Sequence, residues 1–221
     1  MTTRLMVLAA GLGLSVSLVC AGCGQQPGES AAHAQKVTSG RNLRWSSAPK
    51  MFINPHKSYT ATVKTTAGTF IMTLFAQQDP RAVNNFVFLA NHEFFNGDEI
   101  FRVIKPFMFQ TGDPLNNGKG GPGYEWQGET PTFPYQPGIV AMANAGSTNT
   151  NGSQFFVCTG SESTSLNQNP IYTELGRVTK GWSVVQKIAG GQVKTNPETK
   201  EHSLPVHPYY ITSVVISESG S

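Results

Sequence analysis

Charged side chains are scarce in this sequence. Asp, Glu, Lys and Arg make up 13% of its 221 residues, against about a quarter in an average soluble domain. The formal net charge is only +3, and the cations form no cluster or stripe. Nucleic-acid-binding domains carry such a basic patch, so the composition argues against a nucleic-acid partner.

Cysteine is nearly absent as well, with three copies at Cys20, Cys23 and Cys158. The first two lie at the end of an N-terminal apolar stretch, so the rest of the chain holds Cys158 alone. One cysteine cannot build an internal disulfide framework. The fold must therefore depend on its apolar core.

The chain also lacks a long apolar run. Its N-terminus has one early cation, Arg4, and an apolar stretch from Leu5 to Val19, shorter than the roughly 20 residues of a membrane span. This pattern predicts a signal peptide over residues 1–22 and export of the protein. Cys23 follows Ala21-Gly22 and resembles the lipid-modified cysteine of a bacterial lipobox, although Cys20 is an unusual residue three places earlier.

The N-terminal pattern has two interpretations. In one, Cys23 carries lipid, residues 23–50 form a flexible tether rich in Gly, Ser, Ala and Gln, and residues 51–221 form the domain. The protein is then anchored to the outer face of a bacterial cytoplasmic membrane or to a periplasmic membrane face. In the other, an ordinary signal peptide is cut nearby and Cys23 is a stray thiol.

Common catalytic motifs are missing. The segment "GDPLNNGKGG" lacks the spacing of a phosphate-binding loop, the five histidines show no metal-ligand spacing, and no G-x-S-x-G sequence occurs. Cys158 has no sequence signal for a neighbouring base. We therefore expect neither a metal nor a cofactor.

Short strands dominate the remaining pattern. β-branched and aromatic residues flank Ala67-Gly68 and predict a hairpin. Asp79, as N-cap, and Pro80 begin an amphipathic helix, "KGWSVVQKIAGG" predicts a second helix, and "YYITSVVISE" a final strand. Many strands with few helices favour a barrel or a sandwich.

Two segments carry a specific signal. Residues 101–113, "FRVIKPFMFQTGD", and residues 138–160, "GIVAMANAGSTNTNGSQFFVCTG", match in order and spacing the two sequence motifs of the cyclophilin-type peptidyl-prolyl cis-trans isomerases. The resemblance covers roughly residues 59–217. It implies a mainly β protein, a closed eight-stranded antiparallel β-barrel capped by two α-helices. It also implies an enzyme that accelerates the folding of exported proteins, whose substrates are proline-containing unfolded or extended polypeptides, and a monomer.

The resemblance also assigns roles to residues. Arg102, set in an apolar strand, would donate a hydrogen bond to the proline nitrogen of the twisted X-Pro amide, and Gln110 would share the catalytic role. The implied substrate-binding residues are Phe107, Met108, Ala143, Asn144, Gln154, Phe156, Leu166 and Tyr172. Taken one at a time, the apolar residues among them could equally be core, and Arg102 could point to solvent from a half-buried strand.

Two positions depart from the family pattern. Ser165 stands where the family often has tryptophan, and Tyr172 where it often has histidine. The tryptophan usually contacts the drug cyclosporin, so we expect weak cyclosporin binding. Two other functions stay open, namely a non-catalytic module or holdase that grips proline segments at the membrane face and, more distantly, a sugar-binding β-domain.

Overall fold

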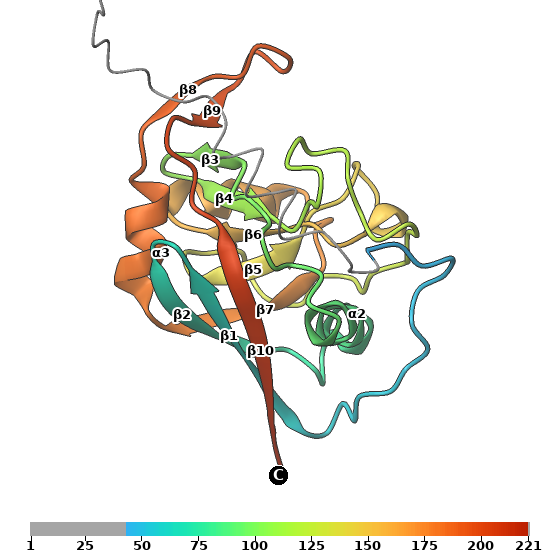
Figure 1. Ribbon diagram of the computed structural model, residues 1–221. Coiled ribbons are helices and arrows are strands. Elements are labelled where there is room, and N and C mark those ends of the chain that lie inside the picture. The colour runs from blue at the N-terminus through green and yellow to red at the C-terminus, as the bar shows by residue number, and fades with distance from the viewer. Residues whose placement is uncertain (1–42, 221) are drawn as a thin grey trace, which may run out of the picture.

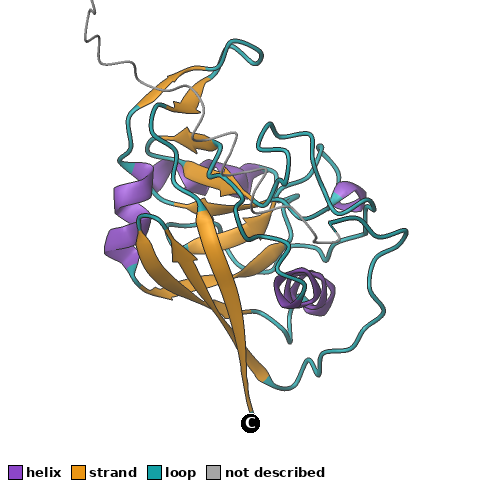
Figure 2. Ribbon diagram, viewed as in Figure 1, coloured by secondary structure: helices purple, strands orange, loops and turns teal. Residues whose placement is uncertain are grey.

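The computed structural model describes residues 43–220. Its strands are β1 (Ser58–Thr65), β2 (Gly68–Leu74), β3 (Arg102–Ile104), β4 (Met108–Thr111), β5 (Ile139–Met142), β6 (Phe155–Cys158), β7 (Glu174–Lys180), β8 (Val193–Thr195), β9 (His202–Pro205) and β10 (Ile211–Ser219). Two α-helices, α2 (Pro80–Asn91) and α3 (Trp182–Ala189), and two 3₁₀ helices, η1 (Thr148–Thr150) and η2 (Ser161–Gln168), complete the fold (Figures 1 and 2).

Eight strands form one curled antiparallel sheet in the order β10-β1-β2-β7-β5-β6-β4-β3, and β8 and β9 form a separate hairpin. The predicted hairpin around Ala67-Gly68 is confirmed, because β1 and β2 pair from Tyr59–Leu74 to Thr65–Gly68. The predicted final strand is β10, which pairs with β1 along its length. The mainly β architecture with two α-helices is also confirmed.

The prediction of a closed barrel is wrong, because the curled sheet is open between β3 and β10. The segment before β3 meets the start of β10 through the isolated bridge Glu99–Tyr210 and a few backbone hydrogen bonds. Gly97 N–H donates to the Ile211 carbonyl at 2.7 Å, Ile211 N–H to the Asp98 carbonyl at 2.9 Å and Ile100 N–H to the Tyr209 carbonyl at 2.9 Å. β3 itself does not pair with β10. β3 has only three residues, and the β8–β9 hairpin packs beside it (Figure 1). A continuous ladder to β10 is therefore not formed.

The main core is built from residues of the curled sheet and of both α-helices. α2 packs against β10 and β7, and α3 against β2, β3 and β4. Phe86 of α2 stacks on Phe95 with ring centroids 5.0 Å apart and meets Phe155 of β6 edge-on at 5.5 Å. All three rings are fully buried or nearly so. Their contacts join the helix to the sheet that carries the two sequence motifs.

Helix α2 begins as predicted, but Asp79 does not cap it. Its side chain makes no capping hydrogen bond, and its backbone lies outside the usual N-cap conformation at φ −125° and ψ 58°. The carboxyl group is fully buried instead and hydrogen-bonds to none of the described residues.

Residues 43–50, which the sequence assigned to the tether, pack on the domain. Trp45 N–H donates to the Pro122 carbonyl at 2.8 Å. The Trp45 ring meets Phe88 of α2 edge-on, with centroids 5.2 Å apart, and lies 6.1 Å from Phe94. The packed domain therefore includes these eight residues. The signal peptide, Cys23 and the rest of the predicted tether lie outside the described residues.

Candidate active site

Arg102 and Gln110 face each other across the β3–β4 ladder, where they form a register pair. Strand alternation gives Arg102 and Val103 opposite faces, and Val103 is buried in the core whereas Arg102 is half-buried. The Arg102 Nη1 donates to the Gln110 Oε1 at 2.9 Å. An arginine in an apolar strand is thus accommodated by an open face and a polar partner.

The hydrogen bonds continue from Gln110 to the next strand. Gln110 Nε2 donates to Gln154 Oε1 at 2.8 Å, and Gln154 Nε2 donates to the carbonyls of Gly118 and Gly120 at 3.1 and 2.9 Å. Each glutamine uses both its acceptor and its donor in this chain. Because cooperative hydrogen bonds restrain one another, this series of hydrogen bonds fixes the orientation of the Gln110 carbonyl toward Arg102.

The predicted apolar wall forms one cluster on the same face of the sheet. Met108, which pairs with Cys158 across β4 and β6, and Phe156 are its buried members among the predicted residues. The partly buried members among them are Phe107, Ala143, Leu166 and Tyr172. Phe156 and Tyr172 meet edge-on with centroids 5.4 Å apart. The structure therefore brings together every predicted wall residue.

Asn144 lies at the edge of this face, directly after Ala143 and β5. Its Nδ2 donates to the Ile171 carbonyl at 2.7 Å, and its Oδ1 accepts from Gly146 N–H at 3.0 Å. A cleft of about 900 Å³ adjoins it and is also lined by Gln110, Ala143 and Gln154. Gln110 of the first motif and Asn144 and Gln154 of the second thus border a single solvent-accessible depression, whereas Arg102 is not among its lining residues.

One residue of the site was not predicted. Glu201 follows the turn between β8 and β9 and binds the Arg102 guanidinium with both oxygens, Nε donating to Oε2 at 2.6 Å and Nη2 to Oε1 at 2.7 Å. The hydrogen bond from Arg102 is the main cause that lowers the pKa of Glu201 below its usual range. The two residues lie 99 positions apart, and Glu201 belongs to neither motif, so no local signal identifies it.

Ser165, the position where the family often has tryptophan, lies near the wall. Ser165 is exposed on η2, and its Oγ donates to the Glu162 carbonyl at 2.7 Å. The next residue, Leu166, packs on the apolar cluster. Weak cyclosporin binding stays a prediction.

Cys158 is fully buried, and burial raises the pKa of its thiol to about 12. This argues against a nucleophilic role, because the thiolate is the reactive form.

Among residues 43–220, no helix combines the length and the apolar character that crossing a bilayer requires.

The known proteins that resemble this chain match the part of it that contains these site residues. The family model "Cyclophilin type peptidyl-prolyl cis-trans isomerase/CLD" matches residues 60–215. A Mycobacterium leprae protein, "Probable peptidyl-prolyl cis-trans isomerase A", is 38% identical over 175 residues, which cover 72% of this chain and 92% of the relative. A mouse protein, "Peptidylprolyl isomerase domain and WD repeat-containing protein 1", is 39% identical over 164 residues, but this chain spans only 23% of its length.

The solved structures include a similar fold. A Cryptosporidium parvum cyclophilin type peptidyl-prolyl cis-trans isomerase, crystallised in the presence of the dipeptide Ala-Pro, superposes with a TM-score of 0.63. It is 27% identical in sequence, and the match covers 72% of this chain and 98% of that one. The similarity therefore extends over almost the whole of that protein.

Proposed function

Because the chain belongs to the cyclophilin-type peptidyl-prolyl cis-trans isomerase family, we propose that it accelerates the cis–trans exchange of X-Pro bonds through Arg102. The observation that carries the proposal is the position of this guanidinium. It is hydrogen-bonded to Gln110 on the next strand and lies on the same face of the sheet as the apolar cluster of Met108 and Phe156. A proline segment needs both parts, an apolar wall for its ring and a donor for its nitrogen.

The chemistry of the bond explains the donor. Amide resonance holds the prolyl bond planar with a barrier of about 18–20 kcal/mol. When the bond twists, resonance is lost and the proline nitrogen has a localised lone pair that accepts a hydrogen bond. A guanidinium fixed beside this nitrogen binds the twisted amide better than either planar isomer, which is catalysis by differential binding. No proton is transferred in this step.

The substrate follows from the same surface. The apolar cluster is small, and its partly buried members Phe107, Leu166 and Tyr172 suit a single proline ring rather than a long apolar segment. The polar border of Gln110, Asn144 and Gln154 suits the backbone of an extended chain on either side of the proline. Proline-containing unfolded or extended polypeptides are therefore the proposed substrates, and exported proteins the proposed clients.

The full chain is expected to isomerise a short Ala-Pro peptide without added metal or nucleotide. Since no proton is transferred, the rate per folded molecule should stay flat between about pH 6 and 8. A protease-coupled assay with and without a chelator measures both properties, and circular dichroism gives the folded fraction at each pH. Loss of turnover with the chelator, or a bell-shaped profile of the rate per folded molecule, would contradict the mechanism.

The location of the protein is a separate proposal. The signal pattern of residues 1–22 and the lipobox-like Ala21-Gly22-Cys23 support export and attachment of the domain to a membrane face through lipid on Cys23. Two or more acyl chains give the stable anchoring that a single chain does not.

The variant Cys23→Ala is expected to lose lipid labelling and to leave either precursor or freely released protein. Metabolic labelling with a radioactive fatty acid, followed by fractionation of membranes from soluble protein, measures the change. Cys158→Ala is the matched control and should retain the label, because Cys158 is buried in the domain. Equal fractionation of wild type and Cys23→Ala, with label in neither, would show that the lipid anchor does not exist.

A further inference from the structure

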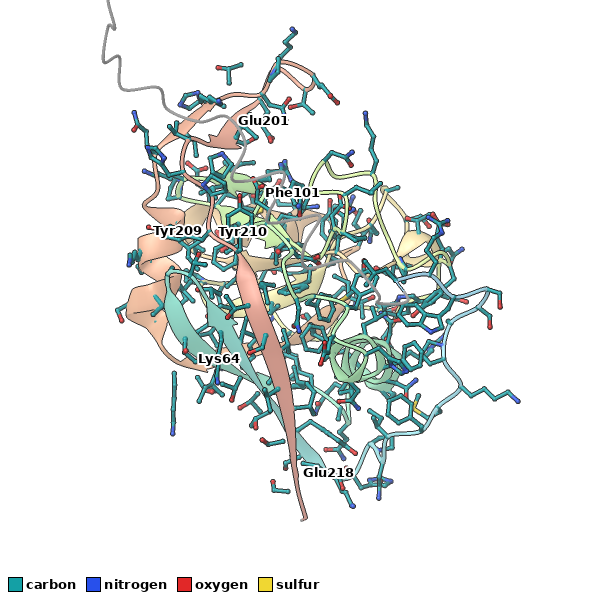
Figure 3. The ribbon with its side chains drawn as sticks, in the orientation of Figure 1. Lys64, Phe101, Glu201, Tyr209, Tyr210 and Glu218 are labelled. Carbon is teal, nitrogen blue, oxygen red and sulfur yellow. The ribbon has the colours of Figure 1, made fainter. Side chains whose placement is uncertain are left out.

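The β8–β9 hairpin brings a carboxylate to the side of the candidate active site. Glu201, which Figure 3 labels, lies directly before β9. β9 packs beside β3 (Figure 1), and Arg102 is the first residue of β3. Both side chains of the Arg102–Glu201 pair are 34% exposed. The pair is therefore partly shielded from water, unlike the exposed pair Lys119–Glu198 in the same region, at 72% and 67%.

The turn that carries Glu201 is closed by its own hydrogen bonds. Asn196 N–H donates to the Glu201 carbonyl at 2.8 Å, and Lys200 N–H donates to the Asn196 carbonyl at 2.9 Å. The Asn196 Oδ1 also accepts from the backbone N–H groups of Glu198 and Thr199 at 2.8 and 3.3 Å. These bonds fix the backbone from which the carboxylate reaches Arg102.

The contacts of Arg102 leave part of the guanidinium available. An arginine has five N–H groups, and Glu201 and Gln110 accept three of them, one each from Nε, Nη2 and Nη1. Glu201 covers the edge between Nε and Nη2. One N–H on each terminal nitrogen is left by these contacts for another acceptor, so Glu201 restrains the guanidinium without using all of its donors.

We propose that Glu201 is a positioning residue for Arg102 in the isomerase reaction, an inference that depends on the proposed function. Without the carboxylate, the flexible arginine side chain has only Gln110 to select one rotamer. With it, bonds on two sides set both the plane and the in-plane direction of the guanidinium. A donor placed in advance stabilises a transition state without reorganising during the reaction, and Glu201 provides part of this placement.

Removal of the carboxylate tests the inference in the full chain. Glu201→Ala should lower kcat/KM by about three- to tenfold, the effect of releasing one rotamer-rich side chain, with the change in kcat and little change in KM. The kcat/KM of Glu201→Gln should lie between the values of the wild type and Glu201→Ala, because the amide oxygen accepts only one of the two N–H groups. Glu198→Gln, in the same turn but paired with Lys119, should leave turnover unchanged.

Nuclear magnetic resonance distinguishes positioning from a general structural effect. In the ¹⁵N-labelled wild type, the Nε–H signal of Arg102 should be protected from solvent exchange, and Glu201→Ala should abolish this protection while the amide spectrum of the core stays unchanged. Full or increased turnover of Glu201→Ala, or an Nε–H signal that does not respond, would overturn the positioning role. A wild-type chain without turnover would instead overturn the proposed function and this inference with it.

Discussion

Arg102→Ala is expected to lower kcat/KM for an Ala-Pro peptide by about 10²–10³, the range for removal of one preorganised donor to a transition state. Gln110 is a poor replacement for the donor, because its amide is neutral and one of its two Nε2 N–H groups already donates to Gln154. The loss should fall on kcat, since the planar substrate gains less from the guanidinium than the twisted one does. Single-turnover kinetics together with peptide binding by titration separate the two parameters.

Arg102 as a catalytic residue and Arg102 as a scaffold residue predict different stabilities. The side chain is half-buried, and its partner Glu201 is 34% exposed, so the carboxylate can be solvated when the arginine is removed and the midpoint of unfolding should shift little. Arg102→Lys should restore little activity, because an ammonium lacks the planar fork that Glu201 and Gln110 hold. Arg177→Ala, an exposed arginine on β7, is the control. Unfolding of Arg102→Ala would favour the structural role.

Local sequence was sufficient for the elements that depend on neighbouring residues. The β1–β2 hairpin, helix α2 and strand β10 all lie where alternation, helical spacing and turn residues predicted them. The clustering of Phe107, Met108, Ala143 and Phe156 was also predictable, because each of the two motifs is nearly continuous in sequence, whereas Leu166 and Tyr172 lie outside both motifs. The residues of the two motifs converge because β4 and β6, one from each motif, are paired in the sheet.

Long-range pairing was not predictable to the same degree. Closure of the barrel depends on whether β3 pairs with β10, which lies about a hundred residues later in the sequence. The β8–β9 hairpin between them is rich in polar residues and gave no periodic signal. The same hairpin supplies Glu201, which therefore had no local signal either, whereas the closed barrel was implied by the family resemblance. Trp45 was likewise hidden, because a single aromatic residue in a polar segment does not form a pattern.

Asp79 shows a third kind of difference, in which the residue was placed correctly and its role was not. The sequence suggested a helix cap, whereas the structure buries the carboxyl group completely. Neither of its oxygens has a hydrogen-bond partner within residues 43–220. Burial, followed by the negative charges of Glu174 and Glu129, raises the pKa of Asp79 to about 8. Unlike Asp79, the buried carboxylate of Glu174 accepts two backbone N–H groups, from Thr132 and Phe133.

This burial should make the stability of the fold depend on pH. A carboxyl group with a raised pKa in the folded state binds a proton more tightly there than in the unfolded chain. Its contribution to the free energy of unfolding is complete below the ordinary pKa of 3.8 and is lost as the pH rises through about 8. A rise of about four pKa units corresponds to a loss of at most about 5 kcal/mol in the free energy of unfolding. The N-terminus of α2 favours a negative charge and offsets about 1–2 kcal/mol of this loss.

The variant Asp79→Asn is therefore expected to match the wild type in stability at about pH 3.5, below the ordinary pKa of 3.8, and to exceed it by about 3 kcal/mol near pH 9. The amide has nearly the shape of the protonated acid and cannot ionise, and its presence also removes one of the charges that repel Glu174. Urea unfolding followed by fluorescence at both pH values measures the difference.

Asp113→Asn is the matched control, because Asp113 is equally buried but accepts N–H groups from Leu115, Asn117 and Gly118. It should destabilise the fold by about 1–3 kcal/mol through lost acceptors. If Asp79→Asn is less stable than the wild type at pH 9, the carboxylate has a favourable partner there and the isolated burial of Asp79 is disproved.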